Sequence, residues 1–86
     1  MPEISRFLGI IITMVYDDHN PPHFHAKYGA FFASIDIEKL TISAGSLPPR
    51  VLGLVLEWAT IHNEDLLADW QLMVKNLPLK KIEPLV

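Results

Sequence analysis

The segment from His23 to Ile37 reads as two strands joined by a tight turn, and it constrains the fold more than any other part of the chain. Gly29-Ala30 fits a two-residue type II′ turn, which takes glycine at its first central position. The register that this turn sets pairs Tyr28 with Phe31, Ala26 with Ala33 and Phe24 with Ile35. Because a slip of one residue would mix these small and apolar pairs with polar ones, the pattern predicts this hairpin in this register.

The rest of the chain predicts an α+β domain over residues 1–86. Phe7–Tyr16 is β-branched, aromatic and apolar on both faces, which favours one strand that is covered on both sides. A short strand is expected at Leu40–Ser43. Two helices are expected to follow, from about Pro48 to His62 and from Asn63 to about Asn76. The predicted architecture is an antiparallel β-meander of about four strands, packed on one face by two C-terminal helices.

The signals around the first helix are specific enough to test. Ala44-Gly45-Ser46 is expected to break the sheet, with Ser46 as the N-cap of the helix. The helix itself is apolar nearly all round, so we expect it to be buried on more than one side. Asn63 is the expected cap of the second helix, and acidic residues fill its first turn, where they suit the helix dipole.

Composition narrows the class of protein. Half of the residues are hydrophobic and only 20% are charged, so we expect apolar surface to be buried in a homo-oligomer or against a partner. The net charge of −3 disfavours direct nucleic-acid binding, although a local basic patch would permit it. The absence of cysteine rules out disulfides and thiolate metal sites, and it fits a cytoplasmic protein. The longest apolar run is too short to span a membrane.

Three of the four histidines lie within one seven-residue segment, at His19, His23 and His25. A His-x-His pair in a strand places both rings on one face, and the predicted register puts Asp36 opposite His23. Imidazole and carboxylate are ligands of divalent transition metals such as zinc. The sequence therefore suggests a metal site made of His19, His23, His25 and Asp36, in which Asp17 or Asp18 could also serve.

Two other interpretations of the cluster stay open. The rings could serve only as hydrogen-bonding groups of the turn and of Asp36. Alternatively, His23 and His25 could be catalytic residues in acid–base chemistry without a metal, with Asp36 orienting a ring. Lys27 shares the face of the two histidines, and a histidine pair beside a cation suits RNA cleavage. Ser34 is the nearest hydroxyl, but a serine in the middle of a strand is usually only a polar-face residue.

The whole chain resembles a known family of small bacterial proteins, filed as domain of unknown function 4160. The most specific part of the resemblance is the block Asp18-His19-Asn20-Pro21-Pro22-His23-Phe24-His25-Ala26. Further matching residues are Met1–Phe7, Tyr28-Gly29, Ile35–Ile37, Leu47-Pro48, Leu54–Ala59, His62, Leu66, Trp70 and Pro78–Leu85.

The resemblance implies a setting but no reaction. The family has no established activity, so it assigns no catalytic residue. Its members look like halves of two-gene modules similar to toxin–antitoxin pairs, which implies a small protein partner encoded nearby. An interaction protein and a histidine-based enzyme are therefore the competing functions. A DNA-binding regulator is disfavoured, because neither predicted helix has a basic recognition face.

Overall fold

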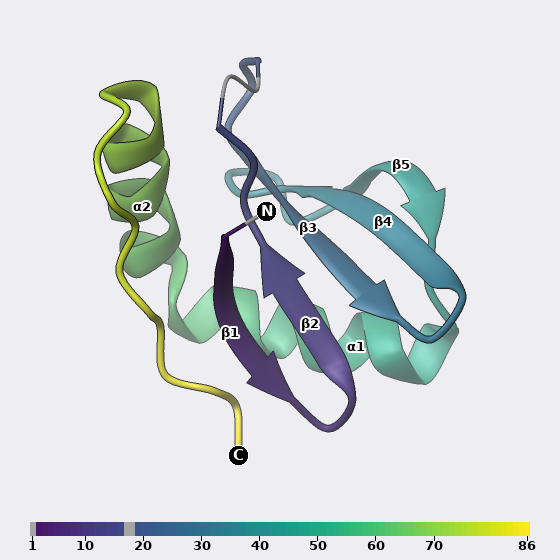
Figure 1. The fold of residues 1–86 in the computed structure, drawn as a ribbon. Coiled ribbons are helices and arrows are strands. Elements are labelled where there is room, and N and C mark those ends of the chain that lie inside the picture. The colour runs from purple at the N-terminus through teal and green to yellow at the C-terminus, as the bar shows by residue number, and fades with distance from the viewer. Residues whose placement is uncertain (1, 17–18) are drawn as a thin grey trace.

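An antiparallel five-stranded meander, ordered β1-β2-β3-β4-β5, forms the centre of the fold (Figure 1). The computed structural model describes residues 2–16 and 19–86. The strands are β1 (Glu3–Phe7), β2 (Ile10–Thr13), β3 (His23–Tyr28), β4 (Phe31–Asp36) and β5 (Ile42–Ser46). They are followed by the helices α1 (Pro49–Ile61) and α2 (Asn63–Val74). The predicted α+β class, a meander followed by two helices, is confirmed.

The β3–β4 hairpin has the predicted register. Tyr28 pairs with Phe31 and Phe24 with Ile35, while His23 stands opposite Asp36. Gly29 has a φ of +58°, as the first central residue of a type II′ turn requires. Phe24 and Ile35 are completely buried, so one face of this hairpin belongs to the core.

The expected single strand over Phe7–Tyr16 is wrong, because the chain reverses direction at Leu8-Gly9. These two residues have φ values of +50° and +80° and form the tight turn between β1 and β2. Two positive φ values in succession match the type I′ turn, which suits the twist of a hairpin. Leucine is rarely found in this conformation, so the sequence gives little warning of the turn. The prediction therefore missed β1 altogether.

The expected sheet break at Ala44-Gly45-Ser46 is also wrong, since these residues lie within β5. Ser46 pairs with Phe32 in the sheet and is not the helix cap. The N-cap of α1 is Pro48, which makes no side-chain capping bond, and Pro49 is the first helical residue. Proline suits this position because the first helical N–H has no partner within the helix.

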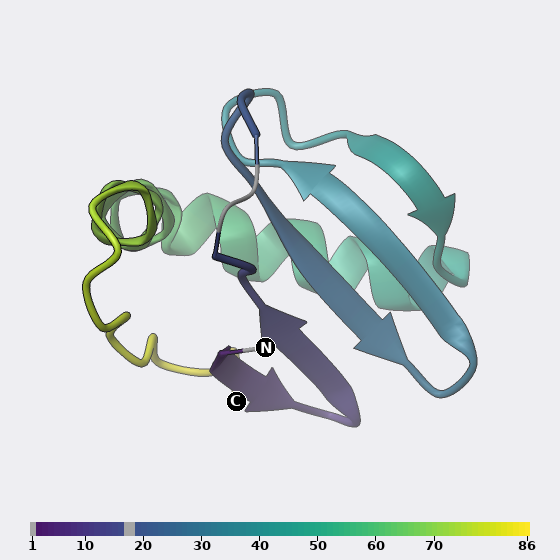
Figure 2. The ribbon, with the colours of Figure 1, turned by 45° about the horizontal axis from the view of Figure 1, so that its top comes forward.

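Trp58 of α1 is the centre of the core. It is fully buried, and its ring lies 5.6 Å from that of Phe7 and 5.8 Å from that of Phe24, measured between centroids. Burial of α1 is concentrated on the face that carries Val51, Val55, Trp58 and Ala59, which packs against the sheet (Figure 2). The expectation that α1 is buried on more than one side is therefore too strong, and Ile61 is largely exposed.

The second helix begins where the sequence indicated, but Asn63 does not cap it. Asn63 is the first residue of α2, and its side chain donates a hydrogen bond to the carbonyl oxygen of Ile37. Glu64 and Asp65 occupy the first turn, as expected. Both views show α2 to one side of the sheet (Figures 1 and 2). Within the described part of the chain, no helix has the length and apolar character needed to cross a membrane.

Residues 78–86 form a C-terminal strap that binds α2, β1 and α1 together. The amide of Ile82 donates to the carbonyl oxygen of Ile4, and the indole N–H of Trp58 donates to that of Glu83, at 2.7 and 2.8 Å. The amide of Lys80 donates to the carboxylate of Asp69. Asp69 is almost fully buried, and this burial raises the pKa of its carboxyl group. The strap is thus part of the folded domain.

Candidate functional site

His23 and His25 lie on the same face of β3, as the strand period predicts. Phe24 and Ala26 alternate with them and point into the core. Lys27 follows on the face of the histidines and is exposed, and Phe32 of β4 stands opposite it. We call this surface, defined by His23, His25, Lys27 and Phe32, the histidine face. It lies on the side of the sheet opposite α1.

Four rings form a continuous row across this region. Trp70 of α2 lies 5.3 Å from His23, His23 lies 5.3 Å from His25, and His25 lies 5.2 Å from Phe32, measured between ring centroids. All three pairs are tilted, an arrangement that is favourable for ring contacts. The row joins a buried indole at one end to a half-exposed phenyl ring at the other. The two imidazoles are therefore held in place by packing on both sides.

The hydrogen bond of His23 fixes which of its nitrogens carries the proton in the neutral ring. Nδ1 lies 2.9 Å from the carbonyl oxygen of Pro21. A carbonyl oxygen can only accept, so Nδ1 is the donor, and the lone pair of the neutral imidazole is on Nε2. This is the arrangement in which Nε2 can take up a proton or bind a metal.

Asp36 stands opposite His23 as predicted, but its carboxylate serves the adjacent turn. Its Oδ1 accepts hydrogen bonds from the amides of Glu38 and Lys39, both at 2.8 Å. Asp36 is also buried, with 6% of its surface exposed. This oxygen of the carboxylate therefore stabilises the turn that follows β4. A role of Asp36 as a metal ligand or as an orienting group for a histidine stays a prediction.

The predicted four-ligand metal site is not assembled among the residues that the structure describes. No three histidine, aspartate or glutamate side chains in 2–16 and 19–86 come together as a metal-binding group. His19 is exposed and precedes β3. Asp17 and Asp18, the other candidates, lie outside the described residues. The fourth histidine, His62, is at the junction of the helices, where Nδ1 lies 3.2 Å from the carboxylate of Asp65.

Two members of the ring row were missed from the sequence, for different reasons. Phe32 could have been found, because the predicted register places it opposite Lys27 and diagonal to His25. Trp70 could not have been found, because its approach to His23 depends on how α2 packs beside the sheet.

Ser34, the nearest hydroxyl, stands opposite His25 as predicted. Its carbonyl oxygen accepts a hydrogen bond from the hydroxyl of Ser43 at 3.3 Å.

These features define a small α+β protein with an antiparallel meander and a histidine pair on the sheet face opposite α1. Comparison with protein-family models matches residues 9–71 to a domain of unknown function, DUF4160. The match covers most of the chain, so the chain belongs to this family. Comparisons with curated proteins and with solved structures gave no match.

Proposed function

We propose that this chain is one component of a two-protein, toxin–antitoxin-like module and acts by binding the protein encoded beside it. The observation that carries the proposal is apolar surface gathered at one end of the sheet. Leu8, Phe31 and Phe32 are 56%, 45% and 44% exposed. The pairing of Ile10 with Tyr28 brings the β1–β2 and β3–β4 turns to the same end of the sheet. Leu8 and Phe31 lie there on the side of α1, whereas Phe32 points to the histidine face.

Exposed apolar side chains that lie on one side of a small protein, as Leu8 and Phe31 do, are typical of an interaction surface. Aromatic residues contribute most to such interfaces, because they bury a large area and lose little conformational entropy. The two-gene arrangement implied by the family resemblance supplies the partner. A charged ligand alone would leave Leu8 and Phe31 in water, whereas a protein partner would cover them.

We expect the untagged chain and the product of the neighbouring gene to form a stable complex when purified together. Phe31→Ser should weaken the complex by about tenfold or more, because an interface aromatic on the side of Leu8 is lost. Val74→Ser is the matched control, since Val74 is also exposed but lies at the end of α2, away from the two turns. Titration calorimetry of the purified pair gives the affinities. A stable complex has a dissociation constant well below about 10 μM and stays together at tens of micromolar. Separate elution of the two proteins at that concentration would contradict the proposal.

A second function is favoured by one specific observation, the hydrogen bond that leaves the lone pair of His23 on Nε2. We propose that His23 acts as the base and His25 as the acid in metal-free cleavage of RNA, with Lys27 close to the phosphate. The two rings are 5.3 Å apart and share a face with Lys27. The exposed ring of Phe32 is suited to stacking on a base.

In this case His23→Ala and His25→Ala should each slow cleavage of single-stranded RNA by about 10²–10⁴-fold. His62→Ala is the control, because His62 is remote from the sheet face and pairs with Asp65. The rate should be bell-shaped in pH and should survive a chelator. Activity that needs added zinc would instead favour a metal-dependent enzyme. Equal cleavage by the wild-type protein and by both histidine variants would rule out the proposal.

A further inference from the structure

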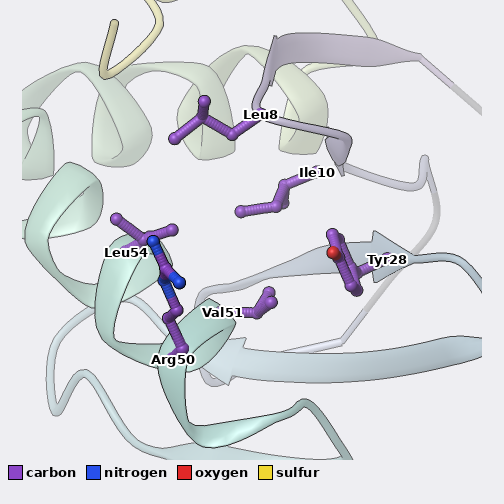
Figure 3. Close-up of a pocket in the computed structure, with 6 residues that line it drawn as sticks. All are labelled: Leu8, Ile10, Tyr28, Arg50, Val51 and Leu54. Carbon is purple, nitrogen blue, oxygen red and sulfur yellow. The ribbon is translucent and has the colours of Figure 1, made fainter.

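A pocket of about 230 Å³ lies between the two tight turns and the start of α1, away from the histidine face (Figure 3). It is lined by Leu8, Ile10, Tyr28, Arg50, Val51 and Leu54. The β1–β2 turn supplies Leu8, the sheet supplies Ile10 and Tyr28, and α1 supplies the other three. This volume is below the range of roughly 300–1,000 Å³ that holds a drug-sized molecule. The pocket has room for one apolar side chain.

Arg50 is the one charged residue in the lining. Figure 3 shows its guanidinium beside Leu54, across the pocket from Tyr28. Within the described part of the chain, Arg50 makes neither an ion pair nor a side-chain hydrogen bond. The other arginine, Arg6, is held by Glu3 at 2.7 Å. A guanidinium beside an apolar pocket suits a ligand whose carboxylate lies next to an apolar group.

The surroundings of the pocket favour a polypeptide as its occupant. Leu8 extends from the pocket into solvent, and Phe31 is the cross-strand neighbour of Tyr28, so apolar surface continues beyond the lining. A small carboxylate would fill the pocket and leave both side chains exposed. An extended segment of a protein would cover them while it inserts one side chain.

From this geometry we infer that the pocket is the docking point for an extended segment of the protein partner. The segment places one apolar side chain between Ile10, Tyr28 and Val51, and the carboxylate of an adjacent Asp or Glu pairs with Arg50. The inference rests on the proposed module for the identity of the partner. The chemistry of the pocket can be tested without that partner.

Three capped dipeptides serve as probes in NMR titrations of the purified chain. N-acetyl-Leu-Glu-amide should shift the amides of Gly9, Tyr28 and Val51 and saturate in the millimolar range, as expected for a ligand of this size. N-acetyl-Leu-Gln-amide lacks the charge, and N-acetyl-Gly-Glu-amide lacks the apolar side chain. Each should bind about tenfold more weakly. Equal binding of the three probes, or no shift of these amides up to the solubility limit, would overturn the inference.

Two variants test whether the charge of Arg50 binds the probe, and they distinguish a failure of the pocket from a failure of the two-protein module. Arg50→Gln should reduce binding of the Leu-Glu probe to the level of the Leu-Gln probe. Lys75→Gln, a charge removal at the end of α2, should leave binding unchanged. In the complex with the neighbouring protein, Arg50→Gln should weaken affinity by about tenfold. A complex that forms equally well with Arg50→Gln overturns the docking assignment but leaves the module intact. Selective dipeptide binding without any complex supports the pocket and contradicts the module.

Discussion

Replacing Trp58 with alanine should lower the free energy of unfolding by about 3–5 kcal/mol. Trp58 is fully buried and contacts Phe7 of β1 and Phe24 of β3, so its removal leaves a cavity where α1 meets the sheet. Domains of this size are often stable by only about 5–15 kcal/mol. Urea denaturation followed by far-UV circular dichroism measures the loss.

If the alanine variant does not fold, Trp58→Phe still tests the contribution of this residue. Phenylalanine preserves most of the ring packing but lacks the indole N–H that donates to the carbonyl oxygen of Glu83. We expect a loss of about 1–2 kcal/mol, from one hydrogen bond and a smaller cavity. If Trp58→Phe cost as much as Trp58→Ala, the hydrogen bond to the strap, and not the ring packing, would be the main contribution of Trp58 to stability.

Gly45→Ala should cost more than about 2 kcal/mol of stability, because alanine meets two obstacles there. Gly45 has a φ of +77°, a conformation that disfavours any residue with a Cβ atom. A Cβ added at this position would also lie 2.1 Å from the carbonyl oxygen of Phe32 and 3.0 Å from Cα of Ala33. Both contacts are with the backbone of β4, so β5 has to move away from its neighbour.

Gly53→Ala is the matched control and should have the opposite sign. Gly53 lies within α1, and nothing outside the helix backbone lies within 4 Å of its added Cβ. Alanine in a helix interior is more stable than glycine by about 0.5–1 kcal/mol. Thermal and urea denaturation of the two variants should therefore diverge. A neutral Gly45→Ala substitution would show that β5 contributes little to the stability of the sheet.

Local patterns predicted the parts of the fold that depend on neighbours in sequence. The β3–β4 hairpin follows from the alternation of apolar residues around Gly29, and the helices follow from their apolar spacing. The β1–β2 turn was not predicted, because Leu8 adopts a backbone conformation that leucine disfavours. That conformation is stabilised by the pairing of β1 with β2, a tertiary effect. Gly45 was taken as a breaker, although its positive φ serves the close approach of two strands.

The candidate site divides in the same way. The shared face of His23 and His25, and Asp36 opposite His23, follow from the register alone. The use of the Asp36 carboxylate by the turn depends on the path of residues 37–39, which the sequence did not specify. The contact between Trp70 and His23 and the pocket beside Arg50 depend on helix placement. Such contacts between distant elements carry no periodic signal.

The strap over β1 has a consequence for self-assembly. A sheet with two open edges can add molecules at both and grow into a filament, whereas protein chains commonly block an edge with a loop. Here the amide of Ile82 and the ammonium of Lys81 both bind carbonyl oxygens of β1, at Ile4 and Glu3. At the other edge β5 pairs, among the described strands, with β4 alone. Pairing between such sheets, edge to edge through β5, would use up the open edge of both molecules and stop at a two-fold symmetric dimer.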